Sequence, residues 1–236
     1  MNRDTDQPRP VIDPTVERYI RLWKERPPDT RPGWYVWTGG WYEEDGENNY
    51  YCNWPMLTED SIVFEAGGYE GAWAKRIADA YDPTIHSFEP APRAHKMAVE
   101  KLAGYPKVHL YLYGLGATNE TLPLGDSDRD GASFLKPDEE PFVMAQKRCF
   151  AEVVQELGVE HIDLMAINIE GGEFELIPHI TQTGLIHSIE RLMIQWHAPG
   201  REDIDIQMGV QERIAETHEM IWNLGAWEAW ERKHDD

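Results

Sequence analysis

The sequence predicts an α/β fold built on a parallel sheet, and three observations support this prediction. Short apolar runs with strand propensity alternate along the chain with segments of helical periodicity. Glycine or proline follows several of the apolar runs, as is typical where a strand turns into a helix. The repeated order strand, helix, strand then implies parallel pairing through right-handed crossovers.

The chain has 236 residues, and we expect an N-terminal extension over residues 1–57 and one main domain over residues 58–236. We expect residues 1–13 to be disordered and residues 14–25 to form a short helix. Residues 29–55 are rich in Trp and Tyr and show neither period. They either pack against the edge of the domain or cover a substrate cleft.

The segment at residues 61–81 is the centre of the prediction. Ile62 to Phe64 is an apolar run that Glu65 ends, residues 67–71 contain three glycines, and residues 72–81 have helical spacing. Such a turn presents helix N–H groups at the ligand crevice of an open sheet. The acidic residues disfavour a pyrophosphate and suit a ligand with an ammonium group and hydroxyls, such as S-adenosylmethionine. A purely structural turn is the alternative.

The same alternation continues to the C-terminus. Gly114 to Gly116 are expected to close the third strand, residues 119–138 to form a long connection, and residues 227–232 to form an edge strand. We expect strands at 84–88, 108–113, 142–144, 162–169, 189–196 and 227–232, and helices at 92–102, 150–157, 173–180 and 204–224.

Acidic residues follow three of the predicted strands. Glu65, Glu89 and Glu170 each come after an apolar run and before glycine or proline. Parallel strands place their carboxyl ends at one edge of the sheet, where α/β proteins bind ligands. A carboxylate after the second strand can accept hydrogen bonds from both ribose hydroxyls. These residues therefore predict a nucleoside-type site.

Composition restricts the partners and the compartment. The formal net charge of −21 argues against binding to a phosphate backbone or an anionic membrane, so we expect no nucleic acid and no membrane partner. Cys52 and Cys149 form neither a disulfide framework nor a metal-ligand set. With no apolar signal segment at the N-terminus, we expect a soluble cytoplasmic protein with free thiols. The sequence does not predict the oligomeric state.

Four blocks of the sequence resemble the FkbM-type methyltransferases, a class I S-adenosylmethionine-dependent family. They read FEAGGYEG, HSFEPAP, IDLMAINIEGGEFELI and MIQWH, and the resemblance covers residues 59–197. It implies a Rossmann-like, doubly wound, mostly parallel seven-stranded sheet with one antiparallel strand near an edge. It further implies methyl transfer from S-adenosylmethionine to a hydroxyl of a sugar, glycan or small metabolite.

The resemblance also implies the cofactor site. The glycine turn would hold the methionine part of the cofactor, Glu89 the ribose, and residues 113–117 would lie near the adenine. The chain departs from the family at Glu65, Tyr69 and Ala166, where Asp, Asn and Lys are usual. The expected cofactor-binding residues are Glu65, Ala66, Gly67, Tyr69, Gly71, Phe88, Glu89, Pro90, Gly114, Gly116 and Asn168.

Transfer to a hydroxyl needs a proton acceptor, and His197 and Glu170 are the catalytic candidates because both follow predicted strands. The sequence does not indicate a metal site. One alternative is a methyltransferase-like, nucleoside-binding module without transfer activity, which the departures at Tyr69 and Ala166 motivate. Another is a nicotinamide-dependent oxidoreductase, which the missing G-x-G-x-x-G pattern disfavours.

Overall fold

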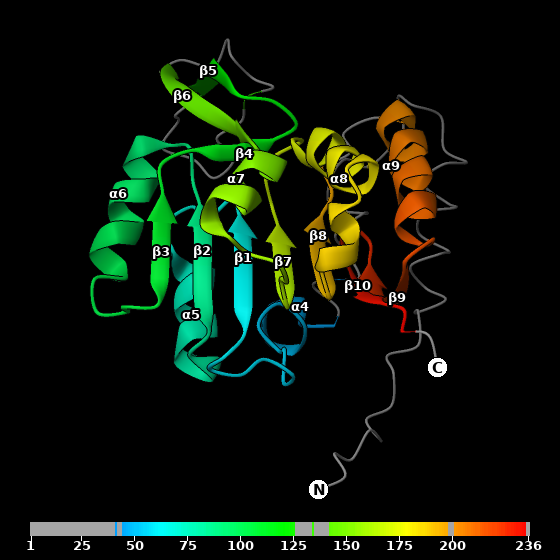
Figure 1. The fold of residues 1–236 in the computed structure, drawn as a ribbon, viewed down its shortest axis with the longest axis horizontal. Coiled ribbons are helices and arrows are strands. Elements are labelled where there is room, and N and C mark those ends of the chain that lie inside the picture. Colours follow the sequence, from blue (N-terminus) through cyan, green and yellow to red (C-terminus); the bar gives the residue numbers. More distant parts are fainter. Residues whose placement is uncertain (1–40, 42–43, 126–133, 135–141, 198–200, 235–236) are drawn as a thin grey trace, which may run out of the picture.

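A computed structural model describes Trp41, Phe134 and residues 44–125, 142–197 and 201–234, with only the backbone described at 201–204. Its centre is a seven-stranded sheet in the order β3-β2-β1-β7-β8-β10-β9 (Figure 1). The strands are β1 (Ile62–Ala66), β2 (Thr84–Phe88), β3 (Val108–Tyr111), β7 (Leu164–Ile167), β8 (Arg191–Gln195), β9 (His218–Leu224) and β10 (Trp227–Arg232).

The strand directions confirm the predicted fold class. Strands β1, β2, β3, β7 and β8 pair in parallel, and β10 pairs antiparallel with both β8 and β9. Within the described part of the chain, β10 is therefore the one reversed strand of this sheet. It lies one position in from the edge, so the prediction of residues 227–232 as the edge strand was wrong, and β9 holds that place.

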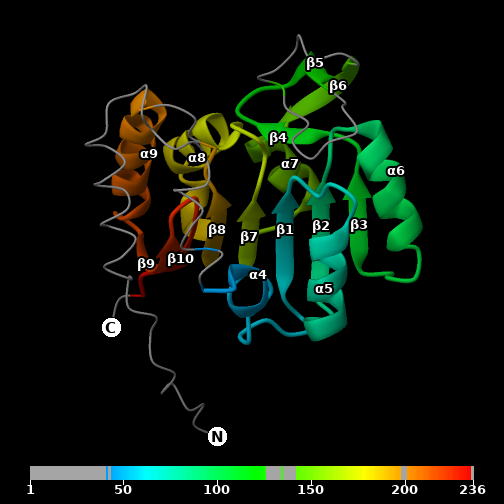
Figure 2. The same cartoon turned by 180° about the vertical axis from the view of Figure 1, so that it is seen from behind.

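Helices cover both faces of the sheet (Figures 1 and 2). The helices α4 (Gly46–Asn49), α5 (Ala72–Tyr81) and α6 (Pro92–Lys101) lie on one face. The helices α7 (Phe150–Leu157) and α8 (Glu173–Gln182) lie on the other, α9 (Arg201–Ile214) packs against α8, and a 3-10 turn spans Leu185–Ser188. None of the described helices is long and apolar enough to cross a bilayer.

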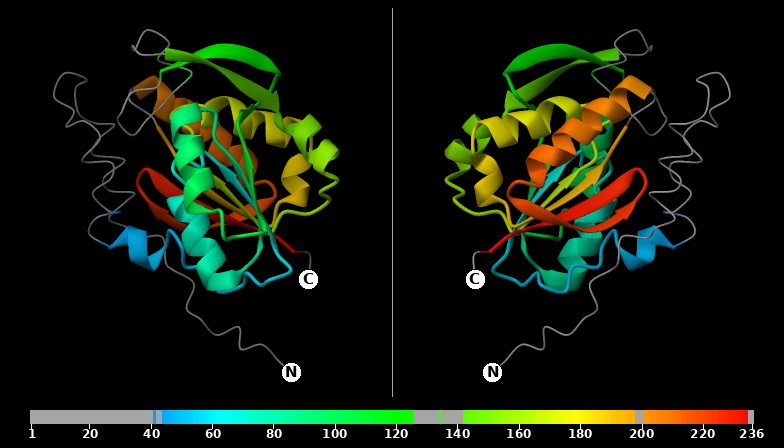
Figure 3. Two further views of the ribbon diagram at one scale, coloured as in Figure 1. Left: turned by 90° about the vertical axis from the view of Figure 1, so that its left-hand side faces the viewer. Right: turned by 90° about the vertical axis from the view of Figure 1, so that its right-hand side faces the viewer.

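A second, three-stranded sheet lies beyond the carboxyl edge of the main sheet (Figure 3). Its strands are β4 (Gly114–Gly116), β6 (Phe142–Cys149) and β5 (Glu120–Gly125). The sequence predicted only a short strand at 142–144 and treated 119–138 as a connection. Pairing between β5 and β6 is antiparallel and non-local, and β5 contains Pro123 and Gly125, which are uncommon in strands, so the local pattern did not reveal it.

The C-terminal region differs most from the prediction. Residues 204–224 were expected to form one helix, but α9 ends at Ile214 and β9 begins at His218. The residues between α9 and β9 include neither glycine nor proline, so the sequence contains no local signal that the helix ends there. Gly225, with φ of 79°, follows β9, and a glycine there ends a helix as readily as it turns a hairpin.

The described part of the aromatic N-terminal segment belongs to the core. Trp41 stacks on Trp227 with ring centroids 4.9 Å apart, and Trp54 is 1% exposed. Tyr51 packs edge-on against Trp227 at 5.0 Å. The expectations for residues 1–13 and 14–25 lie outside the described residues.

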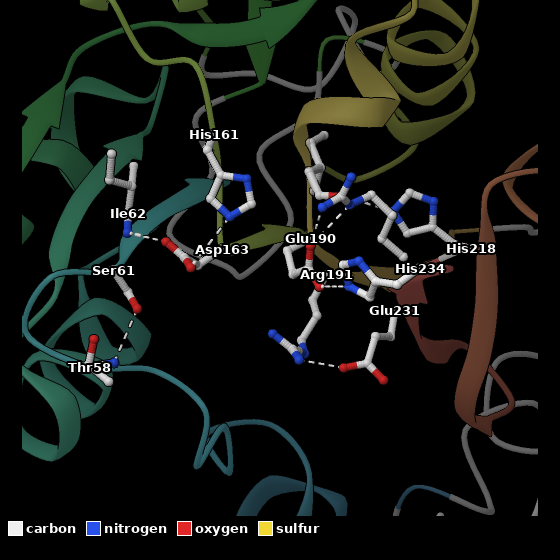
Figure 4. A network of polar contacts seen from close by, with 12 residues as sticks. Thr58, Ser61, Ile62, His161, Asp163, Glu190, Arg191, His218, Glu231 and His234 are labelled. Carbon is white, nitrogen blue, oxygen red and sulfur yellow. Dashed lines mark hydrogen bonds and ion pairs between the residues drawn. The ribbon is translucent and has the colours of Figure 1, made fainter. Parts of the chain in front are cut away.

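Side-chain pairs connect the strands at the amino edge of the sheet (Figure 4). Glu190 accepts from Arg232 at 3.0 Å and pairs with His234 at 2.6 Å. Asp163 accepts from the backbone N–H of Ile62 at 2.8 Å, which joins the starts of β7 and β1. These pairs act between strands that are far apart in the sequence.

Candidate active site at the carboxyl edge

The order of the strands determines where a ligand crevice forms. The chain proceeds from β1 through β2 to β3 on one side, and then returns to place β7 and β8 on the other side of β1. The connections after β1 and β7 therefore leave the carboxyl edge in opposite directions, and such switch points are where open α/β sheets bind ligands. The glycine turn follows β1, and Asn168 follows β7.

The glycine turn is tied to the end of β2. The backbone N–H groups of Gly67 and Gly68 both donate to the carbonyl of Phe88, at 2.9 and 3.1 Å. Gly67 has φ of 87°, and a Cβ there would overlap the carbonyl oxygen of Asn168. Gly71, with φ of 75°, is the N-cap of α5. The turn thus needs glycine at 67, both for its conformation and for its close approach to the segment after β7.

Glu65 lies inside β1 and does not end it, contrary to the prediction. Its carboxyl is 4% exposed and accepts a hydrogen bond from the hydroxyl of Ser87 on β2. Gly68 makes room for this pair, since a Cβ there would collide with the Ser87 hydroxyl. Burial raises the pKa of Glu65 to about 8, so this carboxyl can hold a proton at neutral pH.

Glu89 links the glycine turn to the next helix. One carboxylate oxygen accepts from the N–H of Tyr69 at 2.7 Å, and the other accepts from the N–H of Ala91, the N-cap of α6, also at 2.7 Å. Glu89 is 7% exposed. The predicted ribose-binding residue therefore lies beside the glycine turn, and its carboxylate joins that turn to the start of α6.

Tyr69 occupies a backbone conformation that its side chain disfavours. Its φ is 43°, in the left-handed region where Asn, the residue usual in the resembling family, is better tolerated. The ring packs against a small apolar cluster that includes Ala94 of α6, Leu124 of β5 and Ala145 of β6. Tyr69 thus connects the glycine turn to the three-stranded sheet.

Four further predicted residues contribute less directly. The ring of Phe88 is fully buried against Tyr111, so only its carbonyl faces the turn. Gly114 lies near Pro90, since a Cβ there would meet the Pro90 ring at 3.4 Å. Gly116 instead lies against the side chain of Lys147.

A small cavity opens between the ends of β1 and β7. It has a volume of ≈ 200 Å³, including its opening to solvent. The side-chain oxygen Oδ1 of Asn168 is buried at this cavity and has no hydrogen-bond partner. A buried acceptor without a donor is a costly arrangement that a ligand can correct. The lining residues are Tyr51, Glu65, Ala66, Gly67, Trp73, Ala166, Ile167, Asn168, Met193 and Trp227.

His197 lies between two carboxylates. Its Nε2 is 3.1 Å from Oε1 of Glu170, and its Nδ1 is 3.1 Å from Oε1 of Glu173. Burial alone would lower the pKa of His197, but hydrogen bonds and charge from Glu170 and Glu173 raise it to about 9. The two predicted catalytic residues are therefore in contact with each other, and a third residue joins them.

Sequence reasoning did not find Ser87 and Glu173 as site residues, and it considered Tyr51 only as part of the aromatic segment that packs against the domain edge or covers a cleft. Ser87 precedes Phe88 in β2 and shows no local signal. Glu173 looked like an ordinary acid in the first turn of a helix, where the helix dipole favours it. Within the described residues, no group of three or more His, Cys, Asp or Glu side chains is arranged to hold a metal ion.

No family model matches the sequence. No curated protein matches it either. Among solved structures, a Clostridium thermocellum protein provisionally described as an rRNA methylase superposes with a TM-score of 0.52 at 8% identity, covering 82% of this chain and 97% of that one. A provisionally described methyltransferase from Streptococcus mutans, in complex with S-adenosylhomocysteine, gives 0.49 at 13% identity, covering 81% and 97%. An rRNA methylase from Streptococcus thermophilus gives 0.47 at 15%, covering 76% and 91%.

One expectation has to be corrected. The acidic composition led us to exclude nucleic acid as a partner, and that exclusion was wrong, because the same fold occurs in a protein provisionally described as an rRNA methylase. Net charge describes the whole surface and does not determine what one crevice of this fold accepts. At these identities the likeness shows the fold alone: the chain has the Rossmann-like fold of class I S-adenosylmethionine-dependent methyltransferases.

Proposed function

We propose that this protein is an S-adenosylmethionine-dependent methyltransferase that acts on a hydroxyl group. The observation that carries the proposal is the combination at the switch point: a glycine turn after β1, the Glu89 carboxylate beside it, and the unpartnered Asn168 oxygen across from it. A nucleoside with an ammonium group at its other end matches these acceptors.

The residues present fit the cofactor. The Glu89 carboxylate would accept from the ribose hydroxyls, and Oδ1 of Asn168 would accept from the methionine ammonium group. The cavity beside Asn168 is far smaller than a pocket for a whole ligand of this kind, so it would border only the methionine end. When bound, S-adenosylmethionine supplies an electrophilic methyl group on a sulfonium.

We further propose that the acceptor is a hydroxyl of a sugar, glycan or small metabolite, as in the FkbM-type family that the sequence resembles. The proposed domain comprises residues 58–236, and Tyr51 of the extension supplies one wall of the cavity. Because the same fold occurs in a protein provisionally described as an rRNA methylase, an rRNA fragment belongs in the acceptor screen. The cytoplasmic location remains a prediction.

Either His197 or Glu170 would take the proton of the acceptor hydroxyl. Both lie at the carboxyl edge, within hydrogen-bond distance of each other, and Glu170 is close along the chain to Asn168. Glu170 has φ of 52°, a conformation that is strained for a residue other than glycine. Strain of this kind concentrates at functional sites, where surrounding contacts maintain it.

A binding module without transfer activity is the second candidate. Ala166, where the family usually has lysine, lines the cavity and offers no titratable group. Tyr69, the other departure from the family, packs against the small sheet and does not line the cavity, so Ala166 alone supports this candidate. Binding of the cofactor with no turnover on any acceptor would favour this candidate.

Calorimetric titration of the full chain with S-adenosylmethionine, S-adenosylhomocysteine and NAD tests the proposal. We expect micromolar binding of both sulfur nucleosides and no binding of NAD. An acceptor screen with radiolabelled methyl donor would then compare sugars, glycans, small alcohols and the rRNA fragment. No binding of either sulfur nucleoside would contradict the proposed function.

A further inference from the structure

Glu173 is a buried carboxylate that takes no part in the proposed cofactor site. It is 0% exposed and accepts from two backbone N–H groups, that of His197 at 2.6 Å and that of Gly171 at 2.9 Å, and it lies 3.1 Å from Nδ1 of His197. Hydrogen bonds from several N–H groups favour the ionised carboxylate. An ionised carboxylate only accepts, so Nδ1 of His197 must carry a proton.

The other ring nitrogen faces a second carboxylate. Nε2 of His197 lies 3.1 Å from Glu170, whose side chain is 29% exposed, whereas that of His197 is 14% exposed. A carboxylic acid ordinarily loses its proton before an imidazolium does. Nε2 therefore also carries a proton, and the ring is an imidazolium between two carboxylates. An imidazolium has no lone pair with which to accept another proton.

The backbone around Glu170 is shaped to hold this arrangement. Glu170 and Gly171 have φ of 52° and 101°, and the N–H of Gly171 donates to Glu173. The described charged groups that act on the ring are Glu170, from the loop after β7, and Glu173, from the start of α8. Glu170 is the more exposed of the two carboxylates. It lies on the loop that begins with Asn168, and Asn168 lines the cavity.

We propose that Glu173 is a positioning residue that holds His197 as an imidazolium against Glu170, and that the Glu170 carboxylate, not the imidazole, accepts the proton of the acceptor hydroxyl. The second half rests on the proposed function. As the acceptor oxygen forms its bond to the methyl carbon and the carbon–sulfur bond breaks, the hydroxyl proton passes to Glu170. The proton then leaves to solvent, and the imidazolium is unchanged.

The first experiment needs neither cofactor nor acceptor. Ring ¹⁵N NMR spectra of the full chain follow the protonation of His197, assigned by comparison with His197→Gln. We expect both ring nitrogens to be protonated at pH 7 and to titrate near pH 9. Glu173→Gln should lower that midpoint by more than one pH unit. Glu170→Gln should also lower it, and because Glu170 is partly exposed, this variant tests the charge without changing a fully buried side chain. Glu190→Gln, at the amino edge, should leave it unchanged.

A ring that is neutral at pH 7, or a midpoint that neither Glu variant lowers, would overturn the assignment of Glu173. The second experiment measures the pH dependence of methyl transfer by the full chain. We expect kcat to fall about 100-fold or more in Glu170→Gln, as for loss of an acid–base group. In wild type, the rate should not rise as the imidazolium loses its proton. A rate that rises with that deprotonation would make His197 the base.

The calorimetric titration and the NMR titration together separate the proposed function from the inference about Glu173. If the calorimetric titration shows no cofactor binding, the proposed function fails, while the NMR titration still decides whether Glu173 holds the imidazolium. If the cofactor binds and the ring is neutral, the methyltransferase proposal stands and the inference about Glu173 and Glu170 fails.

Discussion

The two edges of the main sheet use acidic residues in opposite ways. At the amino edge, Glu190 pairs with the side chains of Arg232 and His234 near the rim (Figure 4). At the carboxyl edge, Glu89 and Glu173 are buried and accept mainly from backbone N–H groups of turns. The first arrangement connects strands, and the second fixes the shape of loops.

The backbone shows the same contrast. Tyr69 and Glu170 adopt positive φ at the carboxyl edge, in loops that follow strands. Asp82, near the amino edge, also has positive φ, but it is the C-cap of α5, where this conformation is ordinary. Strain that is not part of a helix cap is therefore found beside the cavity, where an unpartnered Asn168 oxygen also lies. This difference supports the proposed ligand site at the carboxyl edge.

The largest effect is expected from a methyl group at the glycine turn. In Gly67→Ala, the new Cβ would overlap the Asn168 carbonyl, and φ of 87° is unfavourable for alanine. We expect the free energy of unfolding to fall by more than ~3 kcal/mol. The matched control is Gly184→Ala, at φ of 76° with open space around it, which should cost about 1–2 kcal/mol. Urea denaturation of both variants measures the difference, and equal losses would show that the turn is not tightly packed.

The second effect concerns ligand affinity. Glu89→Ala removes the acceptor proposed for the ribose hydroxyls, and we expect the Kd for S-adenosylmethionine to rise more than tenfold, about 1.4 kcal/mol. Glu190→Ala removes a carboxylate at the other edge and should leave the Kd unchanged. Calorimetry measures both, with circular dichroism as the check of folding. Unchanged affinity in Glu89→Ala would contradict the site assignment.

The sequence predicted the framework of this edge well because its signals are local. The bounds of β2, α5 and α7 follow directly from apolar periodicity and from flanking glycine and proline. The position of Glu89 follows from the rule that parallel strands share a carboxyl edge, whereas Glu65 lies inside β1 instead of after it. None of these inferences requires knowledge of which distant residues touch.

What the sequence could not predict depends on tertiary contacts. The strand β9 exists because it pairs with β10, although the apolar spacing of Ile206, Val210 and Ile214 in α9 suggests a longer helix. The role of Glu173 likewise depends on His197, which lies 24 positions away in the sequence. Local propensity does not contain this information.

The third effect gives the two edges opposite dependence on pH. Burial raises the pKa of Glu65 to about 8 from 4.5, so the folded state binds more protons than the unfolded state between these values. Its contribution to stability therefore falls as pH rises through that window. Hydrogen bonds and charge from His234 and Arg232 outweigh burial and lower the pKa of Glu190, whose contribution is present above pH 4.5 and is lost as pH falls through its folded pKa.

Thermal unfolding across pH 5–8 tests this contrast. In Glu65→Gln, we expect a flatter fall of Tm between pH 5 and pH 8 than in wild type. In Glu190→Gln, the fall between pH 5 and pH 8 should keep the wild-type slope, and the whole curve should lie lower. The same slope in Glu65→Gln as in wild type would mean that Glu65 is ionised in the folded protein at neutral pH.

The smallest effect is expected at a partly exposed ion pair of the amino edge. Glu231 pairs with Arg191 across β10 and β8, and its side chain is 32% exposed. Solvent screens such a pair, so Glu231→Gln should lower the free energy of unfolding by less than ~1 kcal/mol, and the loss should shrink further in high salt. Urea denaturation at two salt concentrations measures it. If Glu231→Gln lowered the free energy of unfolding as much as Gly67→Ala, the contrast between the edges would fail. Removing one charge at the amino edge would then cost as much as adding a methyl group in the glycine turn.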